Sequence, residues 1–289
     1  MGSNFKVIIV AENDSLLKYA QNRISSLEKL WSRFEKNSEI SILNNADGKP
    51  VLVSNETKSL IQKMQYGYRI TNAIFDPTIL PMLHKIGYQK SLISDKFSQI
   101  SKDALWPIDF RQLIIEGNLV TMPTTMSIDA GGIGKGLAAD LLVDELLEMG
   151  ATGALVSAGG DIKVSGNSPV GQHWTLAIEN PFDLKSNISY IKLSQGAIAT
   201  SSKLKKRFGN RSHLIINSQN ESSSNLNQTV TVSIISESAA LSEVLAKIPF
   251  SLSIEDSFQI IEKLNASAFV VTEDKVSYSS KNWKGFILE

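Results

Sequence analysis

The stretch Asp129-Ala-Gly-Gly-Ile-Gly-Lys-Gly136 places four glycines within eight residues, between a predicted strand and a helix predicted to begin near Leu137. Glycine lets backbone amides approach a ligand closely, and the start of a helix adds the positive end of its dipole. With Lys135 inside it, the stretch indicates a cradle for a phosphate or pyrophosphate. It is neither a P-loop, because the spacing and the Lys-Ser/Thr ending are absent, nor the dinucleotide fingerprint. A glycine-rich turn without a ligand is the alternative interpretation.

A second pair of glycines beside an aspartate follows in Ser157-Ala-Gly-Gly-Asp161-Ile162, after the next predicted strand. By itself, Gly-Gly-Asp is common in turns. If this turn lies close to the first loop in space, it forms the second wall of one site. Asp129 and Asp161 would then contact ligand hydroxyls or support the residues that do.

The elements on either side of these loops mix strands and helices without a regular strand–helix–strand alternation, which favours an α+β fold over a doubly wound sheet. Residues 85–128 are predicted to be irregular, apart from a short strand at 119–122. Strands are predicted at residues 5–10, 154–157, 174–179, 190–193, 212–217, 229–236, 268–272 and 275–279.

Helices are predicted from apolar residues that recur every three or four positions and from capping residues. The first follows residue 10, with Leu17, Ala20, Ile24, Leu27 and Trp31 on its buried face. The second extends from the N-cap Ser54 to about Ala73, with Leu60, Ile61 and Met64 facing inward. The others are predicted at 136–149, with Leu142, Leu146 and Met149 on one face, at 238–248, and from Ser253, where Asp256 completes a capping box.

The composition excludes several classes of function. Lys plus Arg and Asp plus Glu both number 29, so the chain of 289 residues lacks the broad basic surface that binds nucleic acid. The absence of cysteine excludes disulfides, thiolate metal sites and a cysteine nucleophile. No apolar run reaches the roughly 18 residues of a membrane span, and no secretory signal is visible, so the compartment stays open.

Three further segments carry side chains that could take part in chemistry, each with an ordinary structural alternative. Phe75-Asp76-Pro77-Thr78 follows a helix, where Asp-Pro is often only a stop signal. His213 lies on a predicted strand among apolar residues, where a single histidine is more often structural than catalytic. Ala199–Ser202 supplies hydroxyls ahead of a basic run at 203–207, which is either a solvated loop or a rim that attracts an anionic cofactor.

Taken together and in order, these segments resemble the ApbE family of flavin transferases from Met1 to about Ser280. Several ordered matches are more specific than any single motif. The family patterns Met-Gly-Thr, F-S-x-Y, S-E-I-S-x-L-N, A-F-D-P-T, D-x-G-G-I-A-K-G-x-A-x-D, N-x-G-G-D-I, A-T-S-G and H-I-I-D-P are similar to residues 1–3, 31–34, 38–44, 74–78, 129–140, 157–162, 199–202 and 213–217.

The resemblance implies an ApbE-like fold related to the T-fold, in which mixed sheets and helices form one two-lobed domain over residues 1–289 with an FAD cleft between the lobes. It also implies a Mg²⁺-dependent transfer of FMN from FAD to a Thr or Ser hydroxyl of an acceptor protein, with release of AMP. By resemblance, His213 assists catalysis and Phe34 contacts the adenine side. The FAD-binding positions are Met1, Phe34, Ile74, Phe75, Asp76, Asp129, Lys135, Gly159, Gly160, Asp161, Thr200 and Leu214.

The metal positions implied by the resemblance are Gly132, through its main-chain oxygen, Glu243 and Lys247. The family has D-A-L-A-T where this chain has Glu243-Val-Leu-Ala-Lys247. Glutamate keeps a carboxylate but is one methylene longer, whereas a charged lysine has no lone pair and repels Mg²⁺. The Lys247 ammonium could occupy the place of the metal. Alternatively, Glu243 and Lys247 form a surface ion pair on a helix, worth about 0.3–0.5 kcal/mol.

Other departures concern the histidine segment, where Ile216-Asn217 replaces Asp-Pro, and Phe34, which lacks the hydroxyl of the usual tyrosine. Three hypotheses therefore stay open. The first is an active flavin transferase with an altered metal site, the second is a flavin-binding protein without catalysis, and the third is an FAD pyrophosphatase in which water replaces the acceptor hydroxyl. The identity of the acceptor does not follow from the sequence.

Overall fold

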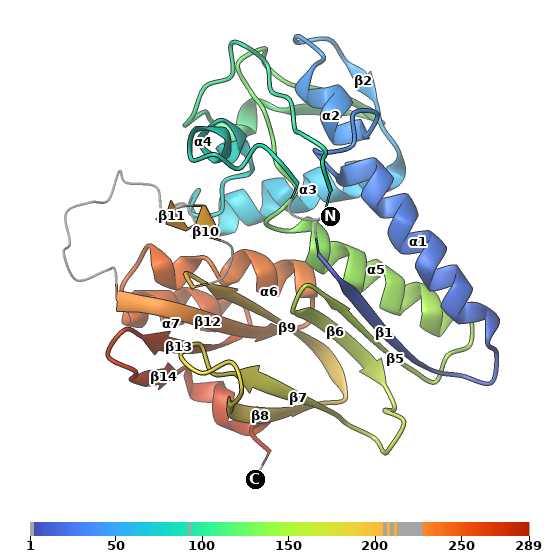
Figure 1. Ribbon diagram of the computed structural model, residues 1–289, viewed down its shortest axis with the longest axis vertical. Coiled ribbons are helices and arrows are strands. Elements are labelled where there is room, and N and C mark those ends of the chain that lie inside the picture. Colours follow the sequence, from blue (N-terminus) through green and yellow to red (C-terminus); the bar gives the residue numbers. More distant parts are fainter. Residues whose placement is uncertain (1–2, 92–93, 205–206, 209–210, 213–227, 289) are drawn as a thin grey trace.

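The computed structural model describes residues 3–91, 94–204, 207–208, 211–212 and 228–288. Two parts lie one above the other (Figure 1). We call them the sheet part, which contains a large β-sheet with helices α5, α6 and α7, and the helical part, which contains α2, α3 and α4. Helix α1 (Ser15–Trp31) runs along the side of both.

The sheet part is built on seven strands in the order β1-β5-β6-β9-β12-β13-β14. Every neighbouring pair in this sheet is antiparallel, which confirms the α+β prediction. The strands are β1 (Phe5–Val10), β5 (Gly153–Ala158), β6 (Asp161–Gly166), β9 (Gln195–Ser202), β12 (Thr229–Ser236), β13 (Ser267–Thr272) and β14 (Ser277–Ser279).

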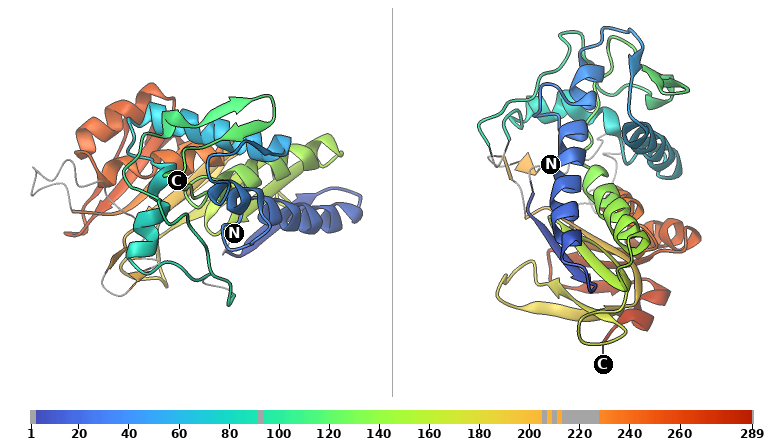
Figure 2. Two further views of the ribbon diagram at one scale, coloured as in Figure 1. Left: turned by 90° about the horizontal axis from the view of Figure 1, so that it is seen from above. Right: turned by 90° about the vertical axis from the view of Figure 1, so that its right-hand side faces the viewer.

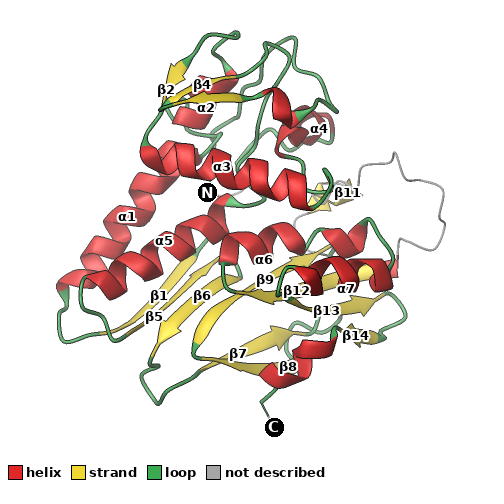
Figure 3. Ribbon diagram, turned by 180° about the vertical axis from the view of Figure 1, so that it is seen from behind, coloured by secondary structure: helices red, strands yellow, loops and turns green. Residues whose placement is uncertain are grey.

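Both faces of this sheet are covered, as the view from behind shows (Figure 3). Helices α5 (Gly134–Glu148), α6 (Ala239–Leu245) and α7 (Ile254–Lys263) lie on one face. The hairpin of β7 (Trp174–Glu179) and β8 (Asn187–Leu193) and the 3₁₀ segment η6 (Lys281–Phe286) cover the other. Side chains alternate accordingly along β5, since Val156 packs with the α5 residues and Leu155 with the hairpin.

The helical part contains α2 (Glu39–Asn44), α3 (Asn55–Ile70), α4 (Leu80–Lys85) and a small antiparallel sheet in the order β2-β4-β3. These three strands are β2 (Val51–Leu52), β4 (Leu119–Thr121) and β3 (Ile114–Glu116), and short 3₁₀ turns lie at η1 (Pro77–Ile79) and η2 (Phe110–Gln112). A further 3₁₀ turn, η5 (Ile248–Phe250), follows α6 and packs in the core of the sheet part. The pair β10 (Arg207–Phe208) and β11 (Arg211–Ser212) completes the described elements.

An ion-pair network on α1 joins the two parts, which lie against the same helix in two further views (Figure 2). The Arg23 guanidinium lies 2.7 Å from a Glu145 oxygen on α5 and 3.0 Å from a Glu56 oxygen on α3. The hydrogen bond to Glu145 is the main cause that raises the pKa of Arg23. A shared core of α1, α2, α3 and the start of α5 lies above it, including Trp31, Ile40, Leu60 and Leu137. That residues 1–289 form one domain stays a prediction.

Several sequence predictions need correction. Leu17 and Met149 were predicted to be buried, but both are exposed. At the start of α1, Leu16 is buried in place of Leu17, and Met149 lies just after the end of α5. Helix α3 ends at Ile70 rather than near Ala73, because Asn72 and Ala73 have left-handed backbone with φ of 49° and 64°. The glycine-rich stretch follows a loop rather than a strand, and α5 begins within it.

The sequence predictions also omitted strands β2, β3, β6, β9 and β10, whereas β1, β7 and β12 have the predicted bounds. The N-caps Ser54 and Ser253 are confirmed, since their side chains accept from Thr57 N and Asp256 N. Of the predicted strand 212–217, only residue 212 lies within the described residues. No helix in the described part of the chain is long and apolar enough to cross a membrane.

Candidate functional site

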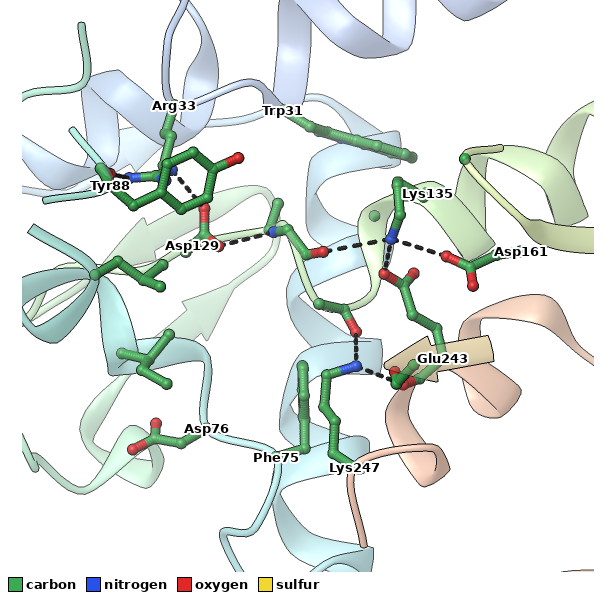
Figure 4. A pocket seen from close by; sticks show the side chains of 18 of the residues that line it. Trp31, Arg33, Phe75, Asp76, Tyr88, Asp129, Lys135, Asp161, Glu243 and Lys247 are labelled. Atoms are coloured by element: carbon green, nitrogen blue, oxygen red, sulfur yellow. Dashed lines mark hydrogen bonds and ion pairs between the residues drawn. The ribbon is translucent and has the colours of Figure 1, made fainter. Parts of the chain in front are cut away.

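A pocket lies between the helical part and the sheet part, and the glycine-rich stretch is at its centre (Figure 4). It gathers segments that are far apart in the sequence: the end of α1, the turn after α3, the start of α5, the β5–β6 turn, the end of β9 and helix α6. The sequence-predicted residues that line it are Phe34, Ile74, Phe75, Asp76, Asp129, Gly132, Lys135, Gly159, Asp161, Thr200, Glu243 and Lys247.

The glycine-rich stretch leads into the first turn of α5, where close contact with α6 leaves no room for a larger residue at Gly136. A Cβ at position 136 would lie 2.4 Å from the main-chain oxygen of Ala239 on α6. The helix has no side-chain cap from its own N-cap residue, Ile133. Its amide at Gly136 instead donates to Glu243 Oε2 at 2.9 Å. Thus a carboxylate from α6 occupies the positive end of α5.

Lys135 is held between two carboxylates from different elements. Its ammonium lies 2.8 Å from Asp161 Oδ2 on β6 and forms a second ion pair with Glu243 Oε1 on α6. All three side chains are nearly buried, with exposed fractions of 11%, 7% and 4%. Burial opposes the charge of Lys135, but the Asp161 and Glu243 carboxylates outweigh it and raise the pKa of the ammonium. Lys135 is therefore a fixed cation that organises the floor of the pocket.

Lys247 does not form the surface ion pair that the spacing of Glu243 and Lys247 suggested, so that alternative is wrong. Glu243 is buried and pairs with Lys135. The Lys247 ammonium donates to the main-chain oxygens of Gly132, at 3.0 Å, and Glu243, at 2.5 Å. It lies 5.8 Å from the centre of the Phe75 ring. It therefore points into the pocket, against the glycine-rich loop.

These contacts test whether the residues present fit the Mg²⁺ that the resemblance implies. Mg²⁺ requires oxygen ligands at about 2.0–2.1 Å with lone pairs directed at the ion. Here the Gly132 oxygen accepts from Lys247, and the two Glu243 carboxylate oxygens accept from Lys135 and from the Gly136 amide. Within the described residues no group of three or more His, Asp or Glu side chains is arranged to hold a metal. The donor set does not fit Mg²⁺, because an ammonium holds the oxygen that the metal would need.

A stacked cation forms the wall of the pocket toward the helical part. The Arg33 guanidinium carbon lies 4.4 Å from the ring centres of both Phe34 and Tyr88. Arg33 Nε is 3.0 Å from Asp129 Oδ1, and Nη1 donates to Tyr88 O and Ser98 Oγ, both at 3.1 Å. Phe34 and Asp129 were predicted from the sequence as binding residues, whereas Arg33 and Tyr88 were not. An arginine beside an aromatic residue at the end of a helix was the available signal for Arg33; none marked Tyr88.

Asp76 has both a structural and a pocket-facing role. Its Oδ1 accepts from the Thr78 amide and hydroxyl, which caps η1, and its Oδ2 accepts from Trp106 Nε1 at 2.9 Å. Burial raises the pKa of Asp76, although these hydrogen bonds oppose the effect. Asp76-Pro77 is therefore not the stop signal of α3, which ends at Ile70; Asp76 caps the start of η1, and the same side chain also lines the pocket.

The β5–β6 turn forms the second wall that the sequence predicted. Gly159 and Gly160 have φ of 65° and 102°, which favours glycine, and a Cβ at Gly159 would meet Ser3 at 2.8 Å. The turn brings Asp161 to Lys135. Gly160 lies in this turn but does not line the pocket, whereas Thr200 lines it from β9 and bonds Ser233 at 2.9 Å. Met1, His213 and Leu214 lie outside the described residues.

Asp140 anchors the helix that carries Glu243. Its carboxylate accepts from the amides of Ala239 and Ala240, at 2.7 and 3.0 Å, and from the Ser238 hydroxyl. Burial raises the pKa of Asp140 despite these bonds. We expect Asp140→Ala to lower the free energy of unfolding by about 1–2 kcal/mol, because two amides at the start of α6 lose their acceptor.

Urea unfolding of Asp140→Ala beside Asp144→Ala tests this expectation. Asp144 is exposed on the same helix, so its replacement should change stability by less than about 0.5 kcal/mol. Equal effects of the two substitutions would contradict the role of Asp140 as an anchor.

Comparisons with known proteins agree on the relatives of this chain. The sequence model of the ApbE family matches residues 1–270 of this chain. The chain is 25% identical over 291 residues to the FAD:protein FMN transferase of Vibrio cholerae, covering 96% of this chain and 86% of that protein. It is 23% identical over 286 residues to the protein of the same name from Klebsiella pneumoniae, covering 95% of this chain and 88% of that protein.

Solved structures show the same fold. The ApbE protein of Thermotoga maritima superposes with a TM-score of 0.83 at 22% identity and covers 99% of both chains. The flavin transferase ApbE of Vibrio cholerae superposes with a TM-score of 0.80 at 22% identity, covering 99% of this chain and 96% of that one. The predicted ApbE-like fold is thereby confirmed.

Proposed function

Because the chain belongs to the ApbE family, we propose that it is an FAD:protein FMN transferase. The proposed substrates are FAD and an acceptor protein that offers a threonine or serine hydroxyl. The full-length relatives named above carry this activity in their names, and they align with nearly all of this chain. The observation that carries the proposal is the pocket itself, which joins the glycine-rich start of α5 to the stacked Arg33 wall.

The proposed reaction is a displacement at phosphorus. The acceptor oxygen attacks the phosphorus of the FMN half of FAD, and a new phosphate ester bond forms as the bond from that phosphorus to the AMP oxygen breaks. AMP leaves with the bonding electron pair, and the hydroxyl proton passes to a base. Catalysis of such a displacement comes mainly from positioning and from charge stabilisation.

The described residues supply binding and orientation in this proposal. The rings of Phe34 and Tyr88, tilted by 49° and packed against the buried Arg33 guanidinium, offer an aromatic surface against which a base or flavin ring stacks. The first turn of α5, with Gly132 and Lys135, faces the diphosphate. His213 is the proposed base, by resemblance alone. The proposed reaction does not use Mg²⁺, because the oxygen of Gly132 accepts a hydrogen bond from Lys247 and the donor set there does not fit the ion.

Two alternatives use the same pocket. A flavin-binding protein without catalysis would keep the cradle and the aromatic wall but not transfer FMN. An FAD pyrophosphatase would use water in place of the acceptor hydroxyl and release free FMN and AMP. Both alternatives are supported by Glu243 and Lys247, which differ from the Asp and Thr of the family pattern at the implied metal site.

The test is to incubate the purified chain with FAD and a flavin-acceptor domain, with and without Mg²⁺, and to measure the intact mass of the acceptor. We expect a gain of one FMN per acceptor and equal release of AMP. An acceptor whose threonine is replaced by alanine is the control and should gain nothing. FMN and AMP released without a mass gain would support the pyrophosphatase, and bound FAD with no AMP would support the binding protein.

A further inference from the structure

The pocket contains two lysines whose ammonium groups are held in different ways. The Lys135 ammonium lies between two carboxylates, Asp161 and Glu243. The Lys247 ammonium donates to two main-chain oxygens, those of Gly132 and Glu243. These two main-chain contacts fix the position of the Lys247 ammonium, which also interacts electrostatically with the Asp161 carboxylate.

The loop is shaped around this ammonium. A Cβ at Gly132 would lie 3.2 Å from Lys247 Cε and 3.1 Å from the Phe75 ring, so either side chain would have to shift by a few tenths of an ångström, and glycine favours the close approach of the lysine. Lys247 follows the end of α6 (Ala239–Leu245), and Asp140 fixes the other end of that helix through Ala239 and Ala240. The ammonium is therefore held by the main chain of the loop that leads into α5, at Gly132, and by the main chain of α6, at Glu243.

The same oxygens are those a divalent cation would need. Gly132 O is occupied by Lys247, and both Glu243 carboxylate oxygens are occupied by Lys135 and the Gly136 amide. A divalent ion entering here would have to displace the Lys247 ammonium from Gly132 O, and this ammonium, on the same side chain nearby, would repel the ion. We infer that the Lys247 ammonium takes the place of a divalent cation in this pocket, so that the chain binds the diphosphate of FAD without a bound metal.

This inference rests on the proposed function for the identity of the ligand. A single positive charge stabilises a diphosphate less than a divalent ion does, but it is permanently in place and independent of free metal concentration. The direct consequence is that FAD affinity does not respond to chelators. The consequence for variants is that removal of the Lys247 ammonium weakens FAD binding, and that a threonine at position 247 opens the main-chain oxygen of Gly132 to a metal.

The first experiment is fluorescence titration of the full chain with FAD in excess Mg²⁺ and in EDTA. For the wild type we expect dissociation constants within about twofold of each other. Lys247→Met should weaken binding at least about tenfold in both conditions. Lys247→Thr should bind weakly in EDTA and regain affinity in Mg²⁺. Lys263→Thr, at an exposed position on α7, is the matched control and should behave as the wild type.

A wild-type affinity that falls tenfold or more in EDTA would overturn the inference without any variant. The second experiment needs no flavin: Mn²⁺ binding to each protein is measured by electron paramagnetic resonance. We expect no bound Mn²⁺ for the wild type and bound Mn²⁺ for Lys247→Thr. Mn²⁺ bound to the wild type would refute the inference, whatever the variant does.

The proposed function and this inference fail separately. If FAD binds independently of metal but FMN is not transferred, the proposed function is wrong and the inference stands. If FMN is transferred only with Mg²⁺ and Mn²⁺ binds to the wild type, the proposed function stands and the inference is wrong. If the wild type binds no FAD in either condition, the proposed function and the inference both fail.

Discussion

Replacing Lys135 with methionine should lower the free energy of unfolding by about 3–5 kcal/mol, the cost of leaving a buried charge without its partner. The ammonium lies between Asp161 and Glu243, which are 7% and 4% exposed. Methionine preserves the apolar stem but leaves two buried carboxylates beside each other. The measurement is urea unfolding at several pH values.

The pH dependence of this loss has a definite sign. Burial already raises the pKa of Asp161, although Lys135 opposes it, so removal of the ammonium raises this pKa further. A carboxyl whose pKa is raised in the folded state binds a proton more readily there than in the unfolded state. The loss caused by Lys135→Met should therefore be greatest at alkaline pH and should shrink as the pH falls through the raised pKa.

Two further variants separate charge from packing. Lys90→Met removes an exposed ion pair with Asp95, in which both side chains are at least half exposed, and should cost far less. The triple variant Lys135→Met, Asp161→Asn and Glu243→Gln removes all three charges and should recover much of the lost stability. A loss that is independent of pH and persists in the triple variant would show that packing, not charge, is the cause.

Much of the fold follows from local sequence signals. Strands β7 and β12 carry clear apolar patterns, and the caps Ser54 and Ser253 mark their helices. Strand β9, by contrast, is Gln-Gly-Ala-Ile-Ala-Thr-Ser-Ser, whose small and polar residues have low strand propensity. Its conformation comes from pairing with β6 and β12 on either side in the large sheet, which is not visible in the segment itself.

The site shows the same division between local and long-range information. The β5–β6 turn is recognisable because its glycines meet a local backbone requirement, as the positive φ at Gly159 shows, whereas Gly136 in the glycine-rich stretch is required by a long-range contact with Ala239 on α6. The pairing of Lys135 with Glu243 joins residues 108 positions apart. The i, i+4 spacing of Glu243 and Lys247 favoured a surface ion pair instead, because spacing reports neither burial nor the approach of α5. Only the packing of α5 on α6 decides between the two interpretations.

Replacing Gly136 with alanine should produce the second large effect, a loss of about 3 kcal/mol in the free energy of unfolding together with weaker FAD binding. The added Cβ would lie 2.4 Å from Ala239 O, 2.5 Å from Ala239 C and 2.6 Å from Ala240 N. All three are backbone atoms, so no side-chain rotation relieves the overlap. Helices α5 and α6 must move apart, which lengthens the bond from the Gly136 amide to Glu243 and shifts Lys247 from Gly132.

Gly134→Ala is the matched comparison, two residues away on the same helix. A Cβ there meets Ala130 Cβ at 3.5 Å and Trp31 at 3.9 Å, which are ordinary contacts. Since alanine favours a helix over glycine by up to about 1 kcal/mol, this variant should be as stable as the wild type or more so. The free energies of unfolding of Gly136→Ala and Gly134→Ala, measured in urea, test this prediction. Equal stabilities would mean that α6 yields easily, and the rigid placement of Glu243 and Lys247 argued from its contact with α5 would then be wrong.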